Sequence, residues 1–139
     1  METTPHPGSR RLGLLLVAGM VFLMWALEAA DLFGAGLDEN GIRPRDPGGL
    51  EGIAFAPFLH AGIGHLLGNA VPFLVLGAAI ALRGLARIAV VTAIVAVVGG
   101  LGTWLTGPAG TLHIGASGLV FGFAAYLVAR GVSSRRIVT

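Results

Sequence analysis

Three polar side chains that could together carry out acyl transfer occur at two separate places in this sequence. His65 and Asn69 are four residues apart, so on a helix they share one face, and Ser117 stands in a later Gly-Ala-Ser-Gly stretch. A serine hydroxyl can attack a carbonyl carbon, and N–H groups of histidine and asparagine can stabilise the oxyanion that forms. Glycines beside the serine permit the close backbone approach that a substrate carbonyl requires. His60 precedes His65 in the same stretch, and Gly115 and Gly118 flank the serine segment.

The chain that carries these residues is too apolar for a soluble domain. Its 139 residues are 55% hydrophobic and 12% charged, they include 23 glycines, and the mean hydropathy is +0.84. Soluble domains contain about 25% charged residues and about 7% glycine. Membrane helices, by contrast, are apolar and use glycine where they approach closely. We therefore predict an all-α, polytopic transmembrane helix bundle. The absence of cysteine excludes disulfides, thiolate metal sites and cysteine nucleophiles.

Four apolar stretches predict the membrane-spanning helices of one membrane domain over residues 12–130. The predicted spans are 12–30, 63–82, 85–105 and 116–129. The first rises far enough, at about 1.5 Å per residue, to cross a hydrocarbon core of about 30 Å, whereas the fourth is short. A long loop rich in glycine and proline separates the first two spans, over 31–59, and its apolar part, 53–59, is expected to pack on the membrane surface. The polar tails are 1–11 and 131–139.

The arginines predict an orientation in the cell membrane. Seven of the nine fall on one side of the four predicted spans: Arg10, Arg11, Arg83, Arg87, Arg130, Arg135 and Arg136. The positive-inside rule then places both termini in the cytoplasm and the loop 31–59 outside. Because the arginines flank apolar blocks and form no stripe, nucleic acid is not an expected partner. A signal peptide or twin-arginine export signal at the N-terminus is the alternative. Glu28, the only acid inside a span, is expected to reach the interface.

This orientation brings the candidate residues to a similar depth, near the outer ends of their helices. Simpler functions remain open for each of them at this point. Ser117 has the residue type of a helix N-cap, and His65 and Asn69 have the types that hydrogen-bond between membrane helices. A metal on His60 and His65 would lack a third ligand of suitable type, so no metal or cofactor is expected.

The two stretches taken together resemble a known family. The pattern His60-x4-His65-x3-Asn69 on one helix, followed by Gly-x-Ser-Gly on a later one, resembles the rhomboid intramembrane serine proteases, and the resemblance covers nearly all of residues 12–130. It implies a core of six helices, with Ser117 as the nucleophile and the side chains of His65 and Asn69, with the Ser117 backbone N–H, as oxyanion donors. It also implies single-pass transmembrane substrates, cleaved near the outer membrane face.

The resemblance places the general base on a sixth helix, beyond the four spans predicted here. We therefore expect this chain to hold part of the catalytic machinery. His113 precedes Ser117 by four residues and is the alternative base. Small residues at Gly118 and Gly122 form a seam that is expected to pack against complementing helices or a second copy. The other functions left open are a rhomboid-like pseudoprotease that binds membrane helices without cleaving them, and a small channel or carrier, which would need a ring of polar residues that the sequence lacks.

Overall fold

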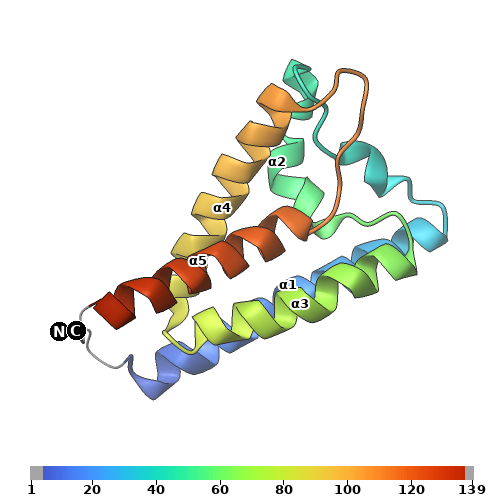
Figure 1. The fold of residues 1–139 in the computed structure, drawn as a ribbon. Helices are drawn as coiled ribbons and strands as arrows, with labels where there is room; N and C mark the ends of the chain where they lie inside the picture. Colours follow the sequence, from blue (N-terminus) through green and yellow to red (C-terminus); the bar gives the residue numbers. More distant parts are fainter. Residues whose placement is uncertain (1–4, 137–139) are drawn as a thin grey trace.

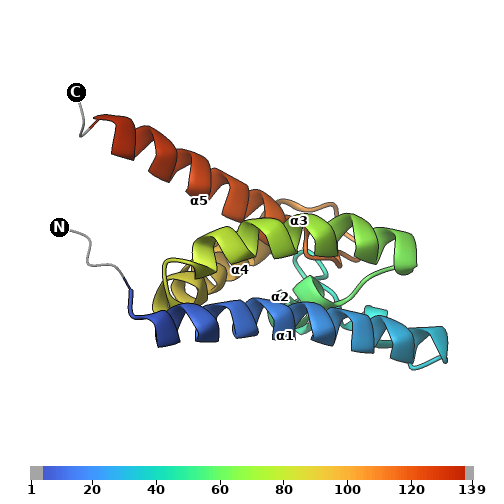
Figure 2. The same ribbon diagram turned by 90° about the horizontal axis from the view of Figure 1, so that it is seen from below.

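Four long helices form a bundle in this computed structural model, which describes residues 5–136, with side chains through Ser133. The long helices are α1 (Pro7–Leu32), α3 (Ile63–Ala81), α4 (Leu85–Thr106) and α5 (Ser117–Arg136). The short elements are α2 (Gly52–Phe55) and the 3-10 helices η1 (Leu37–Asn40), η2 (Pro47–Gly49) and η3 (Ala56–Phe58). In Figure 1, α1 and α3 run side by side, and α4 crosses them at a steep angle. Figure 2 shows the far end of α5 diverging from α1 and α3. The predicted all-α membrane bundle is confirmed.

The lengths of the helices differ in part from the predicted spans. Three helices, α1, α3 and α4, are long and apolar enough to cross a membrane, while α5 is apolar over the shorter stretch Ser117–Ser133. Helix α1 begins at Pro7 and α5 continues to Arg136, so residues 7–11 and 131–136 of the predicted tails are helical. Proline is well suited to the first helical position, and His6 Nδ1 accepts a hydrogen bond from Gly8 N–H at 3.2 Å. Extending a formed helix is easier than nucleating one, which accounts for both extensions. The remaining tail residues, 1–4 and 137–139, lie outside the described residues.

The core is built where small residues let helices approach. A methyl group added to Gly77 of α3 would lie 3.1 Å from a methyl group of Val17 on α1. One turn earlier on the same face of α3, Phe73 packs on Phe123 of α5; both are fully buried, with ring centroids 5.3 Å apart. Such a tilted aromatic pair favours one relative placement of two helices. Helix α3, which carries His65 and Asn69, is thereby fixed against both α1 and α5.

The connections 33–62 and 107–116 lie together at one end of the bundle, which we call the loop end (Figure 1). Ile42 and His113 pair as an isolated antiparallel bridge, with both N–H···O distances 2.9 Å. The backbone N–H of Arg45 donates to Trp104 O at 3.0 Å, and its guanidinium donates to Gly107 O at 3.0 Å, so Arg45 satisfies carbonyls at the end of α4. The first connection is therefore tied to the segment that leads into Ser117.

The structure corrects the expectation for Glu28. Its side chain is only 4% exposed and does not reach a surface, because η1 folds back over the end of α1. The Asp31 carboxylate holds η1 there by accepting hydrogen bonds from the N–H groups of Leu37, at 2.6 Å, and Asp38, at 3.1 Å. Burial, reinforced by the charge of Asp31, raises the pKa of Asp38 to about 6.

The apolar stretch 53–59 also departs in part from its expected place on the membrane surface. Phe55 is exposed, whereas Ala56 and Leu59 are buried within the protein. Ile53 packs so closely on α4 that a methyl group on Gly100 would clash with it. This stretch therefore forms part of the loop end. Because the chain holds it at both of its ends, it can bury apolar side chains against α4.

Candidate active site

Ser117 is the first residue of α5, and its side chain is exposed at the loop end. The carbonyl of the preceding residue, Ala116, accepts the N–H of Val120 at 3.0 Å, which places Ala116 at the N-cap position. Ser117 is therefore inside the helix and is not its N-cap. The N–H groups in the first turn of a helix and the positive end of its dipole favour negative charge nearby. An oxyanion formed beside Ser117 would meet that environment.

His65 and Asn69 lie on the first turns of α3. The N–H of Ala61 donates to His65 Nδ1 at 3.3 Å, and this hydrogen bond assigns the proton of a neutral imidazole to Nε2. Asn69 is buried, and its Nδ2 donates to the carbonyl of His65 at 2.9 Å, which uses one of its two N–H bonds. Each side chain therefore keeps one N–H group for a further acceptor.

The two halves of the site meet at Gly115. A methyl group built on Gly115 would lie 2.8 Å from Nε2 and Cε1 of His65 and 3.8 Å from Nδ2 of Asn69. Gly115, in the segment that leads into Ser117, therefore lies next to the side chains of His65 and Asn69. This contact places both side chains beside Gly115, two residues before Ser117 in the chain.

His60 lies behind this contact and is 1% exposed. Its Nε2 is 3.3 Å from the N–H of Ala116, and its Nδ1 is 3.3 Å from the carbonyl oxygen of Phe58. Its ring meets that of His65 edge to face, with centroids 5.2 Å apart and an interplanar angle of 64°. Burial lowers the pKa of His60 to about 4, so the imidazole is neutral at neutral pH.

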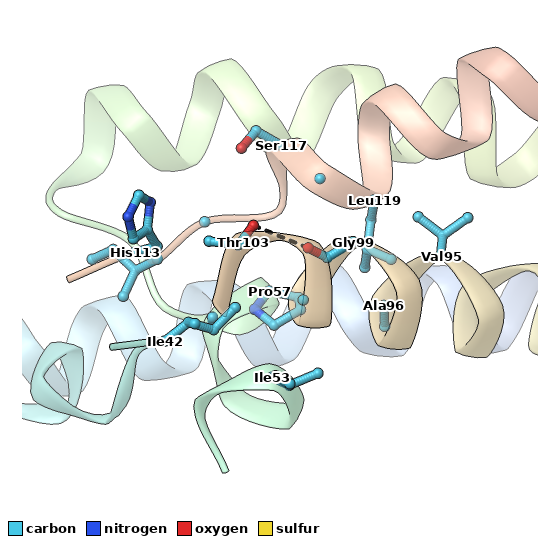
Figure 3. Close-up of a pocket in the computed structure, with 15 residues that line it drawn as sticks. Ile42, Ile53, Pro57, Val95, Ala96, Gly99, Thr103, His113, Ser117 and Leu119 are labelled. Carbon is cyan, nitrogen blue, oxygen red and sulfur yellow. Dashed lines mark hydrogen bonds between the residues drawn. The ribbon is translucent and has the colours of Figure 1, made fainter. Parts of the chain in front are cut away.

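His113 is engaged elsewhere. The hydroxyl of Thr111 lies 2.7 Å from the carbonyl of Pro108 and 2.8 Å from His113 Nε2. The single hydroxyl hydrogen goes to the carbonyl, so Nε2–H of His113 donates to Thr111 and cannot accept a proton. Figure 3 shows this ring and the Ser117 side chain at separate places along the segment. His113 therefore cannot act as a substitute base through Nε2.

A pocket of about 170 Å³ opens beside Ser117 (Figure 3). Apolar side chains from four elements, α2, η3, α4 and α5, line much of it: Ile53, Pro57, Val95 and Leu119. The sequence analysis did not select these residues, because they come from distant segments and carry no reactive group. The one available signal was the Gly99-Gly100 pair of α4, where glycine permits close approach.

The two glycines of the predicted small-residue seam on α5 have different surroundings. Gly122 is already covered by Val95 of α4, so no further helix packs against it, whereas nothing lies near the position of a methyl group on Gly118. Among the side chains that the structure describes, no group of three or more His, Asp or Glu residues is arranged to hold a metal ion.

Comparison with known proteins identifies the family. The Rhomboid domain model matches residues 47–139, more than half of the chain. The chain belongs to the rhomboid family. The matched region of this rhomboid includes the pattern that begins at His60 and the Gly-x-Ser-Gly stretch around Ser117.

Several relatives of this rhomboid are known from their sequences. An uncharacterized protein of Mycobacterium tuberculosis is 47% identical over 141 residues, covering 97% of this chain and 58% of its own. An uncharacterized protein of Mycobacterium leprae is 45% identical over 130 residues, covering 89% of this chain and 52% of its own. The Bacillus subtilis protein named "Putative rhomboid protease YdcA" is 41% identical over 71 residues, covering 50% of this chain and 36% of its own. This rhomboid chain therefore spans little more than half the length of its mycobacterial relatives. No solved structure matches it.

Proposed function

We propose that this chain supplies the nucleophile and the oxyanion-binding groups of an intramembrane serine endopeptidase. The observation that carries the proposal is the contact of Gly115 with His65, which sets the N–H groups of His65 and Asn69 beside the segment that leads into Ser117. Membership of the rhomboid family supports the same chemistry. The substrates are single-pass transmembrane proteins, whose scissile bond enters from the bilayer at the loop end.

The reaction begins when the Ser117 hydroxyl oxygen attacks the scissile carbonyl carbon and its proton passes to a general base. The negative oxygen that forms accepts hydrogen bonds from His65 Nε2–H, Asn69 Nδ2–H and the Ser117 backbone N–H. Collapse of this intermediate releases the amine, which takes the proton from the base, and leaves an acyl group on Ser117. Water, deprotonated by the same base, then hydrolyses the ester. The pocket beside Ser117 accepts an apolar side chain of the substrate.

The base in this proposal is a histidine on a helix outside α1–α5. The basic nitrogens of His60 and His65 already accept hydrogen bonds from Ala116 and Ala61, and Nε2 of His113 is held by Thr111. Nothing lies within 4 Å of the position of a methyl group on Gly118, which lines the pocket beside Ser117, so α5 is open next to the nucleophile. The helix that carries the base comes from further residues of the natural protein or from a second chain.

The arginine distribution supports an orientation with both termini in the cytoplasm of a cell-membrane protein. The start of α1 and the end of α5 lie at the same end of the bundle, opposite the loop end (Figures 1 and 2). In this orientation the active site faces the outer side of the membrane. Cleavage then occurs near that surface.

A second candidate function is binding of membrane helices without cleavage. It is favoured by one observation: Nε2 of His60 and Nδ1 of His65 already accept hydrogen bonds and Nε2 of His113 is bound to Thr111, while the pocket beside Ser117 is formed. Such a pseudoprotease would retain substrate affinity and lack a reactive serine.

Covalent labelling with a serine-reactive fluorophosphonate separates the two functions. The purified chain is labelled in detergent, alone and after co-expression with the part of the Mycobacterium tuberculosis relative that lies outside the region of similarity. We expect weak labelling alone and strong labelling in the complex. Ser117→Ala should abolish it, and the control Ser133→Ala, at the other end of α5, should not. Labelling that is unaffected by Ser117→Ala, or absent from a complex that forms, would reject the protease and favour the pseudoprotease.

A further inference from the structure

We infer that His60 is a positioning residue for the nucleophile, acting through a hydrogen bond that its neutral ring accepts from the backbone N–H of Ala116. This inference rests on the proposed function of Ser117. The contacts of His60 are with the backbone of Phe58 and Ala116 and with the ring of His65. It acts on the residue directly before the nucleophile.

The direction of the hydrogen bonds around His60 follows from its partners. The Phe58 carbonyl can only accept, so Nδ1–H of His60 donates to it, and Nε2 is left as an acceptor. A backbone N–H can only donate, and the N–H of Ala116 lies 3.3 Å from this nitrogen. The two bonds are satisfied together only by the neutral imidazole with its proton on Nδ1. Protonation at Nε2 would remove the acceptor and leave the buried N–H of Ala116 without one.

The position of the Ala116 amide determines where α5 begins in space. Ala116 is fully buried, and its carbonyl accepts the N–H of Val120 in the first turn of α5. The preceding residue, Gly115, donates its N–H to the carbonyl of Ala56 at 2.8 Å. Two consecutive amides are therefore anchored to the segment 56–60, and the second anchor is a side chain. A shift of the Ala116 amide would move the N–H and the hydroxyl of Ser117 with it.

The same ring also supports an oxyanion donor. His60 meets His65 edge to face at a centroid distance of 5.2 Å, and this contact limits the tilt of the His65 ring. His65 is held on its other side by the hydrogen bond from Ala61 to Nδ1. His60 thus contacts both the nucleophile segment, at the Ala116 amide, and the ring of the donor His65, and it supports the placement of each.

Two variants separate the accepting nitrogen from the volume of the ring. His60→Leu removes the acceptor and keeps an apolar side chain, whereas His60→Gln retains an amide oxygen that can accept from Ala116. The readout is the rate of fluorophosphonate labelling of Ser117 in the complex defined above. Misplacement of a reacting group by about 1 Å can cost about a hundredfold in rate. We expect His60→Leu to slow labelling by about tenfold or more and His60→Gln to restore most of the rate, with His6→Leu, at the far end of α1, as the matched control.

Amide exchange supplies a readout that does not depend on reactivity. In protein labelled with 15N-alanine, the Ala116 amide should be protected in the wild type and in His60→Gln, and should exchange quickly in His60→Leu. Ala70, in the middle of α3, serves as the internal reference. Equal labelling rates in wild type and His60→Leu, or equal losses in the Leu and Gln variants at matched melting temperatures, would overturn the inference. An unprotected Ala116 amide in the wild type would also overturn it, whereas a protected amide without any Ser117 labelling would reject only the proposed protease.

Discussion

Gly115 lies against the imidazole ring of His65 so closely that a single methyl group would come within 2.8 Å of Nε2. The φ angle of Gly115 is +114°, which residues with a side chain rarely adopt. Glycine is therefore required here twice, once by the backbone angle and once by the neighbouring ring. The contact joins two segments that are far apart in the sequence and gives the candidate site its shape.

Gly115→Ala should abolish the reaction of Ser117, because the added methyl group must displace the ring of His65 or the segment leading into the serine. Gly110→Ala is the matched control, since Gly110 also has a positive φ, +78°, but nothing lies within 4 Å of an added methyl group. Both variants should lose about 1–2 kcal/mol of stability through the backbone angle. Only Gly115→Ala should lose labelling by the fluorophosphonate. Similar labelling in the two variants would show that the contact with His65 is not needed.

Gly122→Ala should destabilise the bundle by about 1–3 kcal/mol, as overpacking does in cores. Val95 of α4 already covers Gly122 of α5, so the methyl group has no space. Shortening Val95 to alanine in the same protein should recover much of the loss, which thermal unfolding of the single and double variants will measure. Gly102→Ala on α4 is the control, because nothing lies within 4 Å of its added methyl group. Additive effects of Gly122→Ala and Val95→Ala would contradict direct packing between the two residues.

The stability of the protein should fall as the pH is lowered from about 6.5 towards about 4, in part because of His60. Its pKa is lowered in the folded state by burial, so the unfolded chain binds a proton more readily over this interval, and protonation favours unfolding. The titratable neighbour His65 also lowers the pKa of His60, whereas the hydrogen bond to the Phe58 carbonyl raises it. Thermal unfolding of wild type and His60→Leu across this interval should show a smaller loss of stability in the variant. Parallel curves would mean that His60 does not contribute to the pH dependence.

Asp38→Asn should act in the opposite direction and stabilise the protein above about pH 6. The pKa of Asp38 is raised from 3.8 to about 6 by burial and by the charges of Asp31 and Glu28. The folded state therefore favours the protonated acid, and the wild type loses stability as the pH rises through this interval. Asparagine removes the buried charge, so the gain should be present above pH 6 and shrink towards pH 3.8. Glu39→Gln, at an exposed neighbour, is the control, and a gain that does not change with pH would contradict this cause.

The candidate residues on α3 could be predicted because their arrangement is local. Residues four apart on a helix share a face, so the spacing of His65 and Asn69 was enough to place them together. His60 was recognised only as an accessory residue, since its partner, the Ala116 amide, is far away in the sequence. The place of Glu28 was predicted wrongly, because one apolar span does not reveal that η1 folds back over the end of α1.

The sequence by itself determined the class of the protein and was enough to select the candidate reactive groups. Hydropathy and helical periodicity are properties of consecutive residues, so they show that the chain forms membrane helices and that Ser117 stands between glycines at the start of the last predicted span. Only the tertiary structure decided which segments meet. Three features each depend on one pairing of distant segments. They are the bridge between Ile42 and His113, the hydrogen bond from the Ala116 amide to His60, and the packing of α5, where Val95 covers Gly122 and leaves Gly118 open. Packing and hydrogen-bond satisfaction of the whole chain select that pairing, and no short stretch of sequence contains that information.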